Sequence, residues 1–219
     1  MGKIYKKILA SEFVWRISGI SLATSIRATR GIYMNKERYI EHSLKKVKLL
    51  GVPIDNRRVF ELGTGVGGNL ISIANRIESG VGLDINKLFL YHARKLARAF
   101  HADNVKFLWY DGVTFPHLDK FDVIFSINVF ERIPKNSALK ILDQLIPLLD
   151  HNGILKIFFL SERARGTDFT KLLGDNAYVY WNLSELEEIF LYYEGLNNIK
   201  ITEFGEFEKN ALLVTAYRN

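Results

Sequence analysis

Cysteine is absent from this sequence of 219 residues. A chain without thiols forms no disulfides, thiolate zinc sites or cysteine-held iron–sulfur clusters, and it has no cysteine nucleophile. Long hydrophobic runs are also missing, so no membrane-spanning helix is predicted. The basic N-terminal stretch is interrupted by Glu12 and Arg16, and we therefore predict no signal peptide and a cytoplasmic location.

Positive charge is concentrated in one part of the chain. The formal net charge is +6, from 30 Lys and Arg against 24 Asp and Glu. Residues 1–58 hold 13 basic and 4 acidic side chains, whereas the remaining residues hold 17 and 20. The N-terminal quarter is therefore strongly basic and the rest mildly acidic, which makes the basic segment a candidate for recognising an anionic substrate or surface.

The hydrophobic pattern predicts strands that alternate with helices. Short apolar strands are expected over 58–62, 81–84, 105–109, 121–126 and 154–160. Amphipathic or apolar helices are expected over 36–50, 70–77, 87–100 and 137–149. Nearly all-apolar strands that alternate with helices predict a parallel sheet covered on both faces.

The last part of the chain departs from this alternation. A helix is expected over 183–193, with Ser184 as its N-cap and Glu187 as its capping-box partner. Strands over 199–207 and 211–217 are separated by three residues, a link too short for a helical crossover. The predicted fold class is α/β, a Rossmann-like, doubly wound, seven-stranded sheet, mostly parallel with an antiparallel C-terminal strand, plus an N-terminal helical cap.

The predicted organisation is one domain over residues 1–219. Residues 1–55 form the basic helical cap, and residues 56–219 form an α/β core. Within the core, residues 161–181 are a long irregular insertion, and such loops in compact domains are often functional.

A glycine-rich turn follows the first predicted strand, with the sequence ELGTGVGG. Gly63, Gly65 and Gly67 lie where the strand must turn sharply into a helix, and without a Cβ the backbone can approach a ligand closely. Gly63, Gly65 and Gly68 also satisfy the dinucleotide pattern GxGxxG. Asp84, at the tip of the second strand, can accept hydrogen bonds from ribose hydroxyls, whether the cofactor is a dinucleotide or another nucleoside compound. The turn therefore predicts a nucleoside-containing cofactor and does not specify which.

Further features favour a nucleoside cofactor that carries a cationic amino-acid group over a dinucleotide. Glu61 stands two residues before the first glycine, where a carboxylate disfavours a pyrophosphate and suits a cationic amino-acid group. Asp111 follows the third strand and is placed to hydrogen-bond a base edge. The late position of the glycine turn and the closing antiparallel hairpin also differ from the dinucleotide fold.

In order and spacing, these segments resemble the class I S-adenosylmethionine-dependent methyltransferases, especially the small-molecule group that includes the quinone-ring methyltransferases. The resemblance covers residues 58–218 and rests on ELGTGVG, VGLD, Asp111-Gly112, FDVIFS and LLDHNGILKI. It implies S-adenosylmethionine as the cofactor and methyl transfer to a small-molecule acceptor that is anionic, aromatic or lipid-like.

The resemblance also implies a set of cofactor-binding residues. These are Glu61, Gly63, Thr64, Gly65, Gly67, Asp84, Ile85, Asp111, Gly112, Ser126 and Asn128. In this assignment, the glycine turn approaches the methionine part, Asp84 holds the ribose hydroxyls and Asp111 contacts the adenine amino group. Ile85 and Gly112 would flank the adenine. Ser126 and Asn128 would lie beside the methionine part and the reacting methyl group.

No catalytic residue and no metal ligand are assigned. Methyl transfer from a sulfonium is an in-line displacement with an activated donor, so alignment and exclusion of water are the main tasks. The family often has Glu-His after the fourth strand, whereas this sequence has Glu131-Arg132. The Asn/Asp-Pro-Pro-aromatic motif of adenine amino methyltransferases and a metal-binding aspartate are also missing there.

Acceptor recognition is expected from the N-terminal cap and the 161–181 insertion. Arg30, Tyr33 and Arg38 combine cationic and aromatic groups and are the candidate substrate-binding residues, although a solvated basic helix packed on the sheet explains them equally well. The N-terminal segment also suits peripheral contact with an anionic membrane. Alternatives are methylation of RNA or protein through the basic segment, and a non-catalytic cofactor-binding module. No oligomeric state is predicted.

Overall fold

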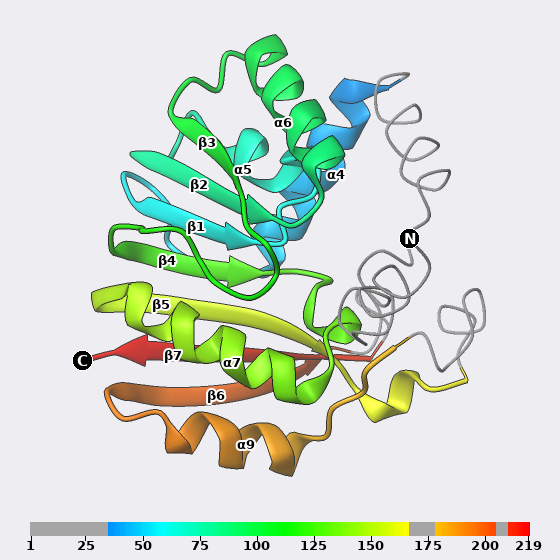
Figure 1. Ribbon diagram of the computed structural model, residues 1–219, viewed down its shortest axis with the longest axis vertical. Helices are drawn as coiled ribbons and strands as arrows, with labels where there is room; N and C mark the ends of the chain where they lie inside the picture. Colours follow the sequence, from blue (N-terminus) through cyan, green and yellow to red (C-terminus); the bar gives the residue numbers. More distant parts are fainter. Residues whose placement is uncertain (1–34, 167–177, 205–209) are drawn as a thin grey trace, which may run out of the picture.

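A single sheet forms the centre of the computed structural model, which describes residues 35–166, 178–204 and 210–219. Its strands are β1 (Arg58–Leu62), β2 (Ser79–Asp84), β3 (Val105–Trp109), β4 (Phe121–Ser126), β5 (Leu149–Leu160), β6 (Leu196–Phe204) and β7 (Ala211–Arg218). They are ordered β3-β2-β1-β4-β5-β7-β6 (Figure 1). The first five strands pair in parallel, and β7 is antiparallel to both neighbours. The predicted Rossmann-like seven-stranded sheet, mostly parallel with an antiparallel C-terminal strand, is confirmed.

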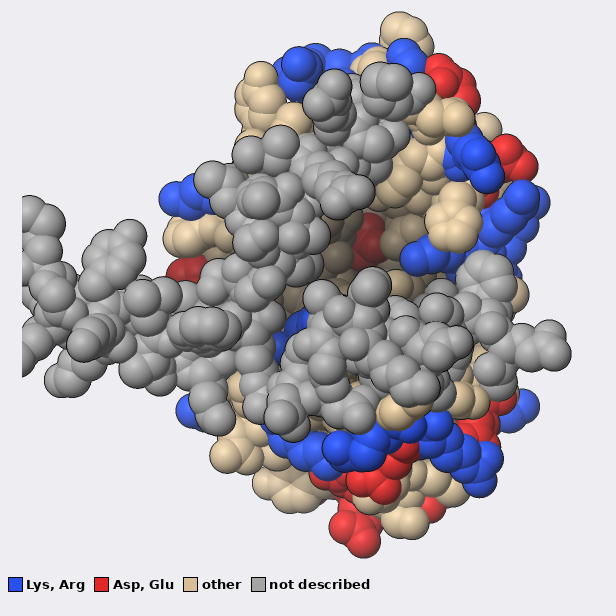
Figure 2. Space-filling model, turned by 90° about the vertical axis from the view of Figure 1, so that its right-hand side faces the viewer, with Lys and Arg blue, Asp and Glu red and all other residues tan. Residues whose placement is uncertain are grey.

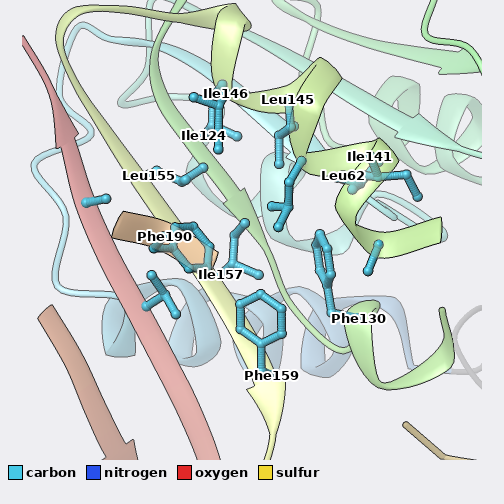
Figure 3. Packing of buried hydrophobic residues seen from close by; sticks show 14 of the residues in the cluster. Leu62, Ile124, Phe130, Ile141, Leu145, Ile146, Leu155, Ile157, Phe159 and Phe190 are labelled. Atoms are coloured by element: carbon cyan, nitrogen blue, oxygen red, sulfur yellow. The ribbon is translucent and has the colours of Figure 1, made fainter. Parts of the chain in front are cut away.

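Helices cover both faces of the sheet (Figure 1). One face packs against α4 (Lys36–Leu49), α5 (Gly68–Ile73) and α6 (Lys87–Ala99), and the other against α7 (Lys135–Leu145) and α9 (Leu183–Tyr192). Short 3-10 helices are η1 (Phe130–Arg132), η2 (Ile146–Leu148) and η3 (Glu162–Ala164). On the α7 side, Leu145 of α7, Phe190 of α9 and Ile157 of the sheet belong to one apolar cluster (Figure 3). On the α4 side, Val47 and Leu90 belong to a second apolar cluster.

The start of α9 differs from the sequence prediction. Asn182 is the N-cap, and its side chain accepts a hydrogen bond from the backbone N–H of Glu185 at 2.8 Å. Ser184 lies inside the first turn, so its prediction as N-cap was wrong, and so was the capping box with Glu187. Asparagine caps helices as well as serine does. The Glu185 side chain pairs with Lys135.

Parts of the two expected recognition elements lie outside the described residues. These parts are 1–34 of the cap, with Arg30 and Tyr33, and 167–177 of the insertion. The described ends of the insertion are adjacent, because Ser161 and Trp181 form an isolated parallel bridge. Among the helices of the described ranges, none has the length and apolar composition needed to cross a bilayer.

Candidate cofactor-binding site

The carboxyl ends of β2, β1 and β4 meet at one edge of the sheet. Leu62, the last residue of β1, pairs with Leu83 of β2 and with Ser126 of β4. The strand order reverses at β1, and open α/β sheets bind ligands at such switch points. Figure 2 faces this edge and shows acidic surface inside a hollow.

Three glycines shape the turn between β1 and α5. Gly63, Gly65 and Gly67 have φ angles of 71°, 56° and 79°, in the left-handed region that favours glycine. A Cβ on Gly63 would lie 2.1 Å from Cγ2 of Val129, and one on Gly67 would lie 2.5 Å from Cζ of Phe107. A Cβ on Gly65 would meet nothing within 4 Å. The turn therefore has a closed side, packed against protein, and an open side at Gly65.

Asp84 borders the open side of the turn. Its Oδ2 accepts a hydrogen bond from the backbone N–H of Gly65 and its Oδ1 from that of Asn86, both at 2.8 Å. Burial raises the pKa of this carboxyl above its usual range, and the backbone N–H groups oppose that shift. A carboxylate oxygen accepts more than one hydrogen bond, so Asp84 can bind hydroxyl groups as well as hold the turn.

Glu61 lies on the closed side of the turn and is fully buried. Its Oε2 accepts a hydrogen bond from Oγ1 of Thr64 at 2.7 Å, and its Oε1 from Nδ2 of Asn69 at 2.6 Å. Burial raises the pKa of Glu61 to about 7, against the effect of these two hydrogen bonds. Glu61 thus fixes the turn from inside the protein, and its contact with a cofactor stays a prediction.

Helix α4 packs directly on the closed side. The Tyr39 hydroxyl lies near the Ser43 side chain and the Gly68 backbone, which both act to lower its pKa. A Cβ on Gly68 would lie 2.5 Å from Cε1 of Tyr39, so the close approach of the helix requires glycine at that position. Burial and the nearby Glu61 carboxylate together raise the pKa of Tyr39 to about 12. The sequence predicted α4 and did not predict this contact.

A cavity of about 190 Å³ opens beside the turn. Predicted site residues in its wall are Gly63, Gly65, Asp84, Ile85 and Asn128. Lining residues that sequence reasoning did not assign are Asn86, Phe89, Tyr110, Val129, Arg132 and Ile133. All of the latter follow the ends of β2, β3 or β4 within seven residues, so extending each strand tip into its loop and first helical turn would have found them.

Asn128 and Arg132 give the cavity polar groups beyond β4. Asn128 has a φ of 58°, and asparagine is among the few residues that adopt this left-handed conformation readily. The Arg132 guanidinium lies over the ring of Tyr178, with 4.1 Å from Cζ to the ring centroid. This cation–π contact holds a positive charge in the cavity wall. Arg132 stands at the position where the family that the sequence resembles often has histidine.

The remaining predicted residues that the structure describes do not line this cavity. Asp111 is exposed, and its Oδ1 accepts hydrogen bonds from two backbone N–H groups of the following turn, which lower its pKa. Gly112 has a φ of 85° in the same turn. Ser126 is buried, and its hydroxyl donates to the Leu62 carbonyl at 3.1 Å. Arg38 is exposed on α4. Cofactor or substrate contacts of these residues stay predictions.

Comparison with known proteins gives two sequence matches. The family model described as a methyltransferase domain matches residues 59–153. The tRNA U34 carboxymethyltransferase of Shewanella sp. (strain W3-18-1) is 32% identical over 124 residues, which are 52% of this chain and 36% of that protein. This chain therefore spans about a third of the length of that curated relative.

Solved structures share the fold. The magnesium protoporphyrin IX methyltransferase of Synechocystis PCC 6803 with bound SAH is 17% identical, with a TM-score of 0.63 over 99% of this chain and 98% of its own. The methyltransferase in complex with the Trm112 activator of Haloferax volcanii is 17% identical, with a TM-score of 0.64 over 95% and 97%. At these identities, the likeness shows a common fold.

Proposed function

We propose that this chain, which has the class I S-adenosylmethionine-dependent methyltransferase fold and a methyltransferase domain at residues 59–153, transfers a methyl group from that cofactor to a small-molecule acceptor. The observation that carries the proposal is the open side of the glycine turn. There Asp84 and an unobstructed Gly65 border one cavity at the switch point of the sheet.

The residues in the cavity wall fit S-adenosylmethionine. Asp84 supplies a carboxylate for the ribose hydroxyls, and Gly65 leaves its backbone accessible. Ile85 and Phe89 supply apolar surface for the adenine ring. When bound, this cofactor supplies a methyl group already activated on a sulfonium, so the protein needs to align the acceptor and exclude water.

Arg132 supports an anionic acceptor. It is the one cation among the described residues that line the cavity, and its position over Tyr178 pre-orients the guanidinium. A guanidinium in a partly apolar cavity attracts a carboxylate or phosphate more strongly than one in water, because the local dielectric constant is lower. In this role Arg132 orients the acceptor and removes no proton, and no residue is assigned as a base.

Calorimetric titration with S-adenosylhomocysteine and with NAD tests the cofactor assignment. We expect S-adenosylhomocysteine to bind and NAD not to bind. Asp84→Asn should weaken the binding of S-adenosylhomocysteine about 10- to 100-fold, because it removes a charged acceptor. Asp119→Asn, at an exposed aspartate outside the cavity, is the matched control and should bind normally. Unchanged affinity in Asp84→Asn, or binding of NAD, would refute the assignment.

RNA is a second candidate acceptor, favoured by the surface of α6. This helix carries four cations and no acidic residue: Lys87, Arg94, Lys95 and Arg98. Tyr91 on the same helix is 54% exposed. Cations bind phosphates and exposed aromatic rings stack on bases, which is the combination found in single-strand binding surfaces. The curated relative is itself named for a tRNA substrate.

Incubation with radiolabelled S-adenosylmethionine and fractionated cell extract separates these candidates. Label in the small-molecule fraction is the expected result. Label in RNA or in protein would overturn the small-molecule proposal. Cofactor binding without any transfer of label would instead favour a regulatory module that binds the cofactor.

A further inference from the structure

A second concave surface lies on the α4 side of the sheet, over β5, β7 and β6. This groove has a volume of about 600 Å³ and is lined by side chains of those strands and by residues 49–51 at the end of α4. In the described part of the chain, it shares no lining residue with the cofactor cavity. Any ligand bound there would therefore be distinct from the cofactor.

Strand register places two lysines in one row across this groove. Lys156 of β5 pairs with Thr215 of β7, and Thr215 pairs with Lys200 of β6. Neighbouring strands are about 4.8 Å apart, and directly paired side chains lie on the same face of a sheet. The two lysine stems therefore leave the sheet about 10 Å apart, with the Thr215 hydroxyl between them. Long flexible stems at this spacing allow both ammonium groups to reach one anion.

Positive charge in the groove lacks a counterion among the described residues. Among the described residues, no acidic side chain lines the groove and neither lysine forms an ion pair. Lys156 is half-buried, and burial together with the charge of Lys200 lowers its pKa. Tyr217 is the other titratable group among the described lining residues. Holding a half-buried cation without a partner is unfavourable, so an anion would stabilise this arrangement.

Apolar side chains lie beside the lysine row. Leu213 of β7 pairs with Phe158 of β5, one alternation along from Thr215 on the same face. The Phe158 and Phe204 rings pack edge to face, with centroids 5.8 Å apart. Phe204, Leu213 and Leu50 all line the groove. The groove therefore combines a cationic row with adjoining apolar surface.

We propose that this groove binds a small organic anion, with its phosphate or carboxylate group between Lys156 and Lys200 and its apolar body on Leu213 and Phe204. A small molecule suits this groove, because the cationic row and the apolar side chains line one cavity of about 600 Å³. The chain's own N-terminal residues 1–34 are positively charged, as the groove is, with six basic and one acidic side chain. Like charges therefore disfavour that segment as the occupant.

Calorimetric titration of the full chain with phenyl phosphate, benzoate and inorganic phosphate tests this site. We expect saturable binding of phenyl phosphate or benzoate and weaker binding of inorganic phosphate, which lacks the apolar body. Lys156→Met and Lys200→Met should each weaken binding at least tenfold, because methionine keeps the stem and removes the charge. Lys140→Met, at an exposed lysine on α7, is the matched control and should leave binding unchanged.

Binding of S-adenosylhomocysteine in the same variants separates this site from the cofactor site, and it should be unchanged in all of them. Three results would overturn the proposal. They are no saturable binding of either organic anion, equal binding by Lys156→Met and the unmodified chain, or the same heat when sodium chloride is titrated in place of the organic anion. Sedimentation of Lys156→Met and the unmodified chain adds a fourth. If the chain dimerises and the substitution alters the dimer, the occupant is a second copy of the chain.

Discussion

The closed and open sides of the glycine turn use similar residues for different purposes. On the closed side, one oxygen of the Glu61 carboxylate accepts a hydrogen bond from Thr64 and the other accepts one from Asn69. On the open side, Asp84 holds Gly65 and also borders the cavity. The two acids stand at or near the ends of adjacent strands, and burial and orientation separate a residue that fixes the turn from one that a ligand can reach. Substitutions on the closed side should therefore change stability most, and those on the open side should change binding most.

The largest expected difference is between Gly63→Ala and Gly65→Ala. Both residues have positive φ, so alanine is strained at each by about 1–2 kcal/mol. At Gly63 the new methyl group also meets Val129 at 2.1 Å, which should bring the loss of unfolding free energy to about 3–4 kcal/mol. Urea denaturation measures both losses. Equal losses in the two variants would contradict the assignment of closed and open sides.

Stability should depend on pH through Glu61. Its pKa is raised to about 7 in the folded protein from 4.5, so the folded state binds this proton more tightly than the unfolded state. The resulting stabilisation is complete below about pH 4.5 and is lost as the pH rises through 7, a change of about 3 kcal/mol. Glu61→Gln should remove this change in urea denaturation at several pH values.

The control for Glu61→Gln is Glu78→Gln, at an exposed glutamate outside the turn. Its pH dependence should match that of the unmodified chain. If Glu61→Gln keeps the full pH dependence, the Glu61 carboxyl is not the titrating group of the closed side.

The smallest expected effect is that of Ser126→Ala. The substitution removes the hydrogen bond to the Leu62 carbonyl between β4 and β1, and it should cost about 1 kcal/mol of unfolding free energy. Binding of S-adenosylhomocysteine should change little, because Ser126 does not line the cavity. A loss of affinity larger than the loss of stability would place Ser126 in the cofactor site, as the sequence predicted.

Much of the fold was predictable because its signals are local. Strand β4 and helix α6 came from apolar periodicity, and the turn came from glycines at short spacing. The N-cap of α9 was wrong by two residues because Asn182 and Ser184 both have capping side chains, and sequence alone does not rank them. Within the site, the sequence identified Asp84 and Gly65 but not Phe89, which its pattern shows only as a helical apolar residue.

The net charge of a stretch of sequence differs from the charge of the local surfaces that the folded protein presents. Outside the first 58 residues, acidic side chains outnumber basic ones. The sequence therefore pointed to the N-terminal segment alone as a surface for recognising anions. In the folded protein, α6 carries its four cations on one helix, and Lys156 and Lys200 share one row of the sheet. Cations that are far apart in the sequence therefore form local positive surfaces on a body of negative balance.

The sequence by itself determined the order of strands and helices, the antiparallel last strand and the glycine turn with Asp84, because these depend on neighbouring residues. The tertiary structure decided that Gly63 is packed and Gly65 open, and that Glu61 is buried. It also decided that Lys156 and Lys200 meet across Thr215. Those outcomes depend on strand register and on contacts between residues distant in the chain, which local patterns do not encode.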